Sequence, residues 1–224
     1  MPEVNFPGPE GRLEGRYHPQ PKKDAPIALI LHPHPQYGGT MNNPVTYALH
    51  YAFRDLGFTV LRFNFRGVGR SQGEFDHGIG ELSDAASALD YLQSMHEGAK
   101  ACWVAGFSFG AWIGMQLLMR RPEVQGFISL ALPANMYDFS FLAPCPSSGL
   151  IVHGEKDALV PTDSVERLVQ KLHQQRGIKI DLELIAGADH FFNSCQEQLE
   201  AVIEGYLDHA LSAAPRKAVA HAAR

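Results

Sequence analysis

The chain has 224 residues, of which 45% are hydrophobic and 19% are charged, and its formal net charge is -5. This size and balance suit one globular domain with a substantial buried core. The acidic net charge argues against nucleic acid as a partner, because phosphate groups bind to basic faces. Apolar runs are only a few residues long, too short for a membrane span, and the N-terminus lacks a signal-peptide pattern, so we expect a cytoplasmic protein without membrane contact.

The three cysteines are too few and too irregularly placed for a disulfide framework. Cys102, Cys145 and Cys195 also match no metal-binding spacing. We therefore expect reduced thiols, as is usual in the cytoplasm, and Cys102 lies in an apolar run where it would be a small buried hydrophobe.

The first elements are two strand-like runs, around residues 4–6 and 12–17, separated by glycine and proline. They predict a hairpin at the edge of a sheet. The next run, Ile27–Leu31, is apolar without interruption. Such a run is typical of a strand buried on both faces of a parallel sheet.

Strand and helix patterns alternate from there to the end of the chain. A helix is expected over 44–56, because Asn43 can cap its start and Pro44 suits the first helical position. The remaining elements are expected in this order: strand 59–64, helix 83–95, strand 102–106, helix 108–120, strand 124–130, strand 149–153, helix 162–175, strand 178–185 and helix 195–211. This rhythm predicts βαβ units and an α/β fold, with a mostly parallel central sheet covered by helices on both faces.

We expect a single domain over residues 1–211. The last stretch, residues 212–224, is rich in alanine with scattered basic side chains. It is expected to be a flexible tail, and the alternative is an extension of the last helix.

The sequence Gly-Phe-Ser-Phe-Gly at 106–110 lies between a predicted buried strand and a predicted apolar helix. In this strand–turn–helix context the G-x-S-x-G pattern predicts a sharp turn that exposes the hydroxyl of Ser108 above the sheet. Gly106 and Gly110 would leave room where a Cβ atom would collide with neighbouring backbone. We therefore expect Ser108 to be a nucleophile; the alternative is a glycine-bracketed turn with an inert serine.

A serine nucleophile needs a general base and an acid that orients the base. His190 follows the last predicted strand, in the loop where sites of open α/β sheets form, and we expect it to be the base. Asp157 follows the preceding strand and is the expected acid, with Glu155 as the rival. Asp189 precedes His190 directly, so its side chain should point elsewhere.

The segments 106–110, 153–157 and 189–192 resemble the triad segments of α/β-hydrolases. The resemblance covers almost the whole chain, from about Ile27 to Leu211. The segment 31–43, Leu-His-Pro-His-Pro-Gln-Tyr-Gly-Gly-Thr-Met-Asn-Asn, resembles a compact bacterial subgroup without a lid. That subgroup is close to dienelactone hydrolases and prolyl-oligopeptidase-like serine hydrolases. The resemblance implies an α/β-hydrolase fold with an N-terminal antiparallel edge hairpin and no large cap domain. Dienelactone hydrolases carry cysteine at the elbow, where this chain has Ser108.

The resemblance also implies an oxyanion hole of two backbone N–H groups. One is that of Phe109, the residue after the nucleophile. The other comes from the loop after strand 27–31, where relatives often have His-Gly-x. Proline has no N–H, so Pro33 and Pro35 are excluded, and alignment with His-Gly-x favours His34. The fallback donors are Gln36 and Tyr37.

Two other motifs could suggest a ligand-binding role. His32 and His34 are spaced so that both could face a metal, but no carboxylate or cysteine lies nearby in the sequence. We expect no metal and no cofactor, and assign the two histidines to shaping the loop. The glycine-rich loop Arg66–Ser71 suggests a phosphate cradle, but it lacks the Lys-Ser/Thr of a P-loop, so we expect a structural loop.

The segment 131–148 is too short for a lid domain, which predicts an open site. We expect aromatic residues to line it, namely Phe107, Tyr137 and Phe191, with Phe109 beside them. The expected substrate is a small molecule, an ester or thioester of a small to medium acyl group, cleaved through an acyl-enzyme.

Two other functions stay open. One is a prolyl-oligopeptidase-like serine peptidase, in which Glu74, Asp76 and Glu81 could help to bind a substrate amine. The other is a non-catalytic binding protein on the same fold. Whether the chain forms a homodimer is also open.

Overall fold

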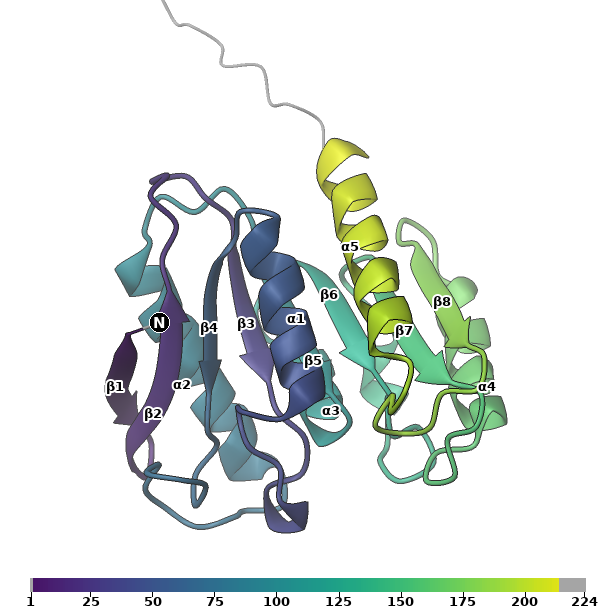
Figure 1. The fold of residues 1–224 in the computed structure, drawn as a ribbon, viewed down its shortest axis with the longest axis horizontal. Helices are drawn as coiled ribbons and strands as arrows, with labels where there is room; N and C mark the ends of the chain where they lie inside the picture. The colour runs from purple at the N-terminus through teal and green to yellow at the C-terminus, as the bar shows by residue number, and fades with distance from the viewer. Residues whose placement is uncertain (1, 214–224) are drawn as a thin grey trace, which may run out of the picture.

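The computed structural model describes residues 2–213, which form a twisted sheet of eight strands with helices on both faces (Figure 1). The strand order is β1-β2-β4-β3-β5-β6-β7-β8. The strands are β1 (Glu3–Gly8), β2 (Gly11–His18), β3 (Ile27–Leu31), β4 (Thr59–Phe63), β5 (Cys102–Phe107), β6 (Val124–Leu130), β7 (Gly149–Gly154) and β8 (Ile180–Ile185).

The sheet is parallel except at its N-terminal edge. Strand β1 pairs antiparallel with β2, and β2 pairs antiparallel with β4, whereas all pairs from β4 across to β8 are parallel. All five residues of β3 are buried, as expected for an apolar strand with a helical layer on each face. The predicted mostly parallel sheet and its antiparallel edge hairpin are therefore confirmed.

Five helices cover the two faces. They are α1 (Pro44–Asp55), α2 (Ile79–Met95), α3 (Phe109–Leu118), α4 (Thr162–His173) and α5 (Gln196–Ala213), with short 3-10 turns at η1 (Pro35–Tyr37) and η2 (Ser140–Leu142). Helices α1 and α5 pack on one face and α2, α3 and α4 on the other (Figure 1). Residues 212 and 213 belong to α5; the rest of the predicted tail, 214–224, lies outside the described residues.

The order of the strands determines where a site can form. From β3 the chain moves outward to β4 on one side and then returns to β5 on the other side of β3. Loops that leave the carboxyl ends of β3 and β5 therefore diverge, which opens a crevice at that edge. Strands β7 and β8 run parallel to β5 and end at the same edge, so their following loops reach the crevice too.

Only a short connection joins β6 to β7. Residues 131–148 contain η2 and otherwise irregular backbone, and no lid domain is inserted there. The crevice is therefore open to solvent on this side. No helix within residues 2–213 has both the length and the apolar composition needed to cross a membrane.

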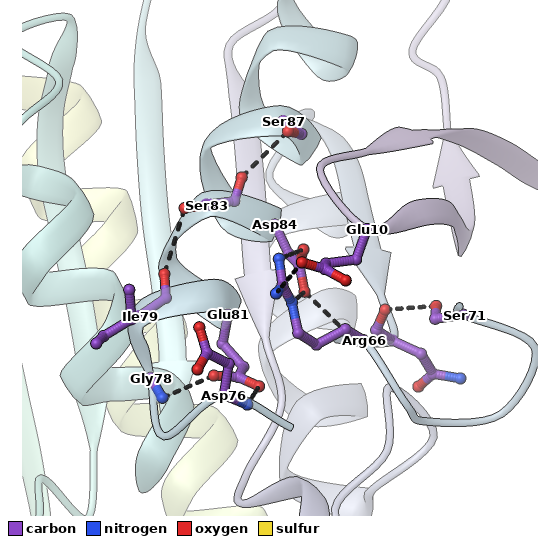
Figure 2. A network of polar contacts seen from close by, with 11 residues as sticks. Glu10, Arg66, Ser71, Asp76, Gly78, Ile79, Glu81, Ser83, Asp84 and Ser87 are labelled. Atoms are coloured by element: carbon purple, nitrogen blue, oxygen red, sulfur yellow. Dashed lines mark hydrogen bonds and ion pairs between the residues drawn. The ribbon is translucent and has the colours of Figure 1, made fainter. Parts of the chain in front are cut away.

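Helix α2 begins at Ile79, about one turn earlier than its apolar pattern predicts. The carboxylate of Glu81 accepts hydrogen bonds from the backbone N–H groups of Asp76 and Gly78, at 2.9 and 2.7 Å (Figure 2). These bonds satisfy donors that a helix start would otherwise leave unpaired. The hydrophobic pattern could not show this, because the extra turn is stabilised by a polar contact.

The glycine-rich loop after β4 is fastened to α2 by a buried ion pair (Figure 2). Nη2 and Nε of Arg66 donate to the two carboxylate oxygens of Asp84 at 2.8 and 3.0 Å. The side chain of Asp84 is fully buried and that of Arg66 is 4% exposed. The guanidinium of Arg66 is therefore already paired and not free to bind a phosphate, which supports the predicted structural loop.

We predict that Asp84→Ala destabilises the protein by about 3–5 kcal/mol, because it leaves the buried Arg66 charge with only Glu10, whose Oε1 lies 3.8 Å from Nη1. A matched control exists on the same helix: Asp90 pairs with Arg121 but its side chain is 66% exposed. Asp90→Ala should therefore cost about 1 kcal/mol or less. Urea unfolding of the two variants measures the difference, and equal losses would contradict a structural role for the Arg66–Asp84 pair.

Candidate active site

Ser108 occupies the turn between β5 and α3. Its backbone has φ 53° and ψ -116°, a strained conformation for a residue with a Cβ atom. A Cβ at Gly106 would collide with the carbonyl of Gly110, and one at Gly110 would collide with the carbonyls of Leu31 and His32. Both glycines are therefore required for the close packing of β5, α3 and β3 that creates the turn.

Three predicted residues from separate loops meet at this turn. Nε2 of His190 lies 3.1 Å from Oγ of Ser108, and Nδ1 of His190 lies 2.7 Å from Oδ2 of Asp157. His190 and Asp157 are buried, at 6% and 7% exposure. This is the continuous nucleophile–base–acid arrangement that activates a serine hydroxyl.

The carboxylate of Asp157 is held by its own loop as well as by His190. Its Oδ1 accepts hydrogen bonds from the N–H groups of Leu159 and Val160, each at 2.8 Å. Burial alone would raise the pKa of Asp157, but the hydrogen bonds from His190 and from the backbone outweigh it and leave the pKa below its usual range. The group is therefore an anion at neutral pH that can stabilise a protonated His190.

His153 supports this acid loop. Its ring is fully buried, and Nε2 lies 2.9 Å from the carbonyl oxygen of Val160. A carbonyl only accepts, so Nε2 carries the proton. Burial lowers the pKa of His153, which keeps the ring neutral although Asp157 Oδ2 lies 3.9 Å away. His153 is the second-last residue of β7, and its contact with Val160 depends on the path of the following loop, which no sequence pattern indicates.

The rival acids do not reach His190. Glu155 is exposed, and the structure gives its side chain no contact with His190. The carboxylate of Asp189 accepts from the N–H groups of Phe191 and Asn193 and from Nδ2 of Asn193. Asp189 therefore shapes the loop that carries His190, and its carboxylate makes no hydrogen bond to that histidine, which agrees with the expectation that it points elsewhere.

The backbone N–H groups of the two expected oxyanion donors, Phe109 and His34, donate to no other described residue. Phe109 begins α3, so its N–H lies at the positive end of the helix dipole. The fallback donors are already used: the N–H of Gln36 donates to Nδ1 of His34, and that of Tyr37 donates to the His34 carbonyl. Of the expected donors, Phe109 and His34 are thus the two that remain available for an oxyanion.

His32 links the loop after β3 to the loop after β4. Its Nε2 accepts from the N–H of Phe65 at 3.0 Å, so Nδ1 must carry the proton that it shares with the Pro33 carbonyl at 2.6 Å. Burial lowers the pKa of His32 to about 3. Both ring nitrogens are committed to backbone groups, which leaves no lone pair on His32 for a metal ion.

The crevice above Ser108 is a pocket of about 540 Å³. Tyr137 and Phe191 line it, as predicted, and Tyr137 is held in place by stacking on Trp112 at a ring distance of 4.1 Å. The pocket is also lined by Met136, Leu159 and Asn43, for which no sequence pattern indicated this position. Among the described residues that line this pocket, none is Asp, Glu, Lys or Arg.

Phe107 does not line the pocket, contrary to expectation. As the last residue of β5 its side chain is fully buried, and its ring packs against His190 at 5.4 Å and against Phe191 and Phe192. Successive side chains of a strand point to opposite faces, so a residue next to the nucleophile in sequence can still lie beneath the sheet edge. Phe107 supports the base instead of contacting the pocket.

The three acidic residues considered for binding an amine do not converge on the pocket. Glu81 is fully buried and occupied with the start of α2. Glu74 and Asp76 are not among the lining residues. The described lining residues therefore carry no permanent charge, and the histidines among them are His34 and His190.

The sheet order and the elbow define an α/β-hydrolase, and comparison with known proteins agrees. The model of the X-Pro dipeptidyl-peptidase (S15) family matches residues 16–204, and the chain belongs to this family.

Related proteins cover almost the whole chain. A crystal structure from Agrobacterium tumefaciens, described as a candidate α/β-hydrolase, is 64% identical with a TM-score of 0.92, and the match covers 94% of this chain and 97% of that one. An α/β serine hydrolase without a lid from Xanthomonas campestris is 32% identical with a TM-score of 0.84, and covers 96% of each chain. An uncharacterised protein of Rickettsia prowazekii is 54% identical over 92% of this chain and 89% of its own length. The predicted compact fold without a lid is thereby confirmed.

We predict that His32 stays neutral, with the proton on Nδ1, down to a pH near its pKa of about 3. Two-bond ¹H–¹⁵N NMR spectra recorded from pH 8 to pH 4 test this, with His32→Asn used to assign the signal. Between its ordinary pKa of about 6.5 and the lowered value, only the unfolded chain binds this proton, so His32 reduces stability as the pH falls. Titration of the ring near its ordinary pKa would contradict the buried hydrogen-bonded geometry.

Proposed function

We propose that the protein is a serine hydrolase that cleaves neutral esters or thioesters of small to medium acyl groups through an acyl-enzyme at Ser108. The observation that carries the proposal is the hydrogen-bonded series Ser108–His190–Asp157, which opens onto a pocket without charged lining residues. We place the activity in the cytoplasm, where the three free cysteines would stay reduced.

In the first step Nε2 of His190 accepts the proton of the Ser108 hydroxyl while Oγ attacks the acyl carbon. The carbonyl oxygen becomes an oxyanion, and the N–H groups of Phe109 and His34 donate to it. His190 then gives the proton to the leaving alcohol or thiol, and the acyl group stays on Oγ. Water, deprotonated by the same histidine, releases the acid and restores Ser108.

Asp157 has a supporting part in this mechanism. Its carboxylate accepts a hydrogen bond from Nδ1–H of His190, which directs the lone pair of Nε2 toward Ser108. Its negative charge stabilises the imidazolium that forms in each half-reaction. The two backbone N–H groups on its other oxygen keep it from rotating.

The pocket itself suggests the size and polarity of the substrate. A volume of about 540 Å³ is within the usual range for small-molecule sites. Since no lid covers it, a long acyl chain would gain little burial beyond the rim. The exposed apolar side chains of Met136, Leu159 and Phe191 at the pocket favour uncharged, partly apolar groups.

A second candidate is peptidase activity, which the family match to X-Pro dipeptidyl-peptidases favours. Such an enzyme needs a partner for the charged N-terminal amine of a dipeptide unit. The described lining residues include no carboxylate, so an ammonium group would enter the pocket without a counter-charge. The third candidate is a binding protein without catalysis. Binding alone does not require the hydrogen-bonded series Ser108–His190–Asp157.

We predict that wild-type protein hydrolyses p-nitrophenyl butyrate and is labelled by a fluorophosphonate probe, and that Ser108→Ala abolishes both. Removing the nucleophile should lower kcat by at least about 10³-fold. Alanyl-proline p-nitroanilide, assayed in parallel, reports peptidase activity. Labelling that survives Ser108→Ala would remove Ser108 as the nucleophile, and a higher kcat/KM for the anilide than for the ester would favour the peptidase.

The shape of the site also predicts a dependence on acyl length. Across p-nitrophenyl acetate, butyrate and palmitate, kcat/KM should be greatest for one of the two short esters, because only the first few methylenes can be buried. Steady-state kinetics below the critical micelle concentration of the palmitate measure this. A clear preference for palmitate would contradict the proposed substrate size.

A further inference from the structure

One wall of the pocket comes from the segment between β3 and α1, and two of its side chains begin helical turns. His34 is the N-cap of η1, where its Nδ1 accepts from the N–H of Gln36 at 3.2 Å. Asn43 is the N-cap of α1, where its Oδ1 accepts from the N–H of Val45 at 2.9 Å. Both His34 and Asn43 line the pocket.

In both His34 and Asn43 the capping hydrogen bond uses an acceptor atom of the side chain, so the donor group of the side chain is not used by the cap. Since Oδ1 of Asn43 is occupied, the remaining polar group of that side chain is the Nδ2 amide, with two N–H bonds. Burial, with the nearby His77 as a second cause, lowers the pKa of His34, so its neutral ring carries the proton on Nε2. Neither Asn43 Nδ2 nor His34 Nε2 donates to any residue within 2–213.

The opposite wall differs in character. Met136, Leu159 and Phe191 contribute apolar surface there, and no described lining residue carries a permanent charge. A ligand that complements both walls is uncharged, apolar on one side, and bears a hydrogen-bond acceptor on the other. A carboxylate would find no cation to offset its desolvation, and an ammonium group would meet donors like itself.

We propose that Asn43 is a specificity-determining residue, which donates from Nδ2 to an uncharged oxygen of the substrate close to the scissile ester. The preferred substrates are then oxygen-bearing esters, with an ether, carbonyl or hydroxyl oxygen near the reacting group, and not plain alkyl esters. This inference rests on the proposed ester hydrolysis at Ser108.

The identity of the cap residue permits a clean test. Ser, Asp and Asn are comparable N-caps, so helix α1 does not by itself require asparagine. Of these three, asparagine alone can use its oxygen as the cap and still present an amide donor. Asn43→Ser keeps the cap and removes that donor, and Asn43→Asp keeps the cap and replaces the donor by a negatively charged acceptor.

The experiment compares esters that differ only in one methylene replaced by oxygen. On the acyl side the pairs are p-nitrophenyl butyrate with p-nitrophenyl methoxyacetate, and p-nitrophenyl pentanoate with p-nitrophenyl 3-methoxypropanoate. On the alcohol side the pair is heptyl acetate with 2-butoxyethyl acetate. Each kcat/KM ratio of oxygen-bearing to alkyl ester is divided by the same ratio for alkaline hydrolysis, which removes the difference in intrinsic reactivity.

For wild type we expect this normalised ratio to be about three to ten in at least one pair, because that is the effect of one neutral hydrogen bond. Asn43→Ser should bring it close to one, and Asn43→Asp should bring it below one through repulsion of the oxygen. Met136→Ala, on the apolar wall, is the control: it should lower both rates of a pair and leave their ratio unchanged. Thermal unfolding checks that each variant is folded, and either Asn43 variant is sufficient for the comparison.

Two failures can be told apart. If alkyl esters are hydrolysed through Ser108 but the ratio is the same in wild type and both Asn43 variants for every pair, the role of Asn43 is overturned and the proposed function stands. If no ester is hydrolysed, or hydrolysis survives Ser108→Ala, the proposed function fails and this inference fails with it.

Discussion

The close approach of the α3 backbone to β3 and β5 is the constraint on which the site depends. Helix α3 can begin directly above the sheet only because Gly106 and Gly110 have no Cβ atoms to meet the carbonyls around them. The same approach forces Ser108 into its strained conformation and brings the N–H of Phe109 toward the loop after β3. The exposed position of the Ser108 side chain and the position of the Phe109 N–H group are thus products of one packing contact.

Burial and hydrogen bonding give four histidines around this contact different chemical states. His32 and His153 are fully buried and bonded to backbone groups. Both rings are therefore neutral, and they stabilise the loops that follow β3 and β7. His34 is only partly buried and retains a free donor. His190 alone bridges a hydroxyl and a carboxylate, which is the arrangement that can move a proton. Eleven histidines in the sequence could not be sorted this way without their neighbours.

The family match and the pocket favour different substrates. The family match favours a peptide, whereas the pocket, without charged lining residues, favours an uncharged ester. A fold determines where the loops at the sheet edge can lie, whereas the substrate is chosen by the side chains in those loops. In this chain those loops contribute aromatic, aliphatic and amide groups and no carboxylate among the described lining residues. The proposed ester hydrolysis follows from these loops, and the family relationship follows from the sheet and the elbow beneath them.

The sequence by itself determined the alternation of strands and helices, the elbow around Ser108, and the strand-end positions of Asp157 and His190, because hydrophobic periodicity and glycine spacing act over short stretches of chain. It placed Phe107 in the pocket and began α2 one turn late, because a strand's two faces and a polar cap are resolved only by neighbours in space. The distances among Ser108, His190 and Asp157, the bracing by His153, and the pocket position of Asn43 were decided by tertiary structure alone. These features join residues from loops far apart in the chain, and only the packed sheet brings those loops to one edge.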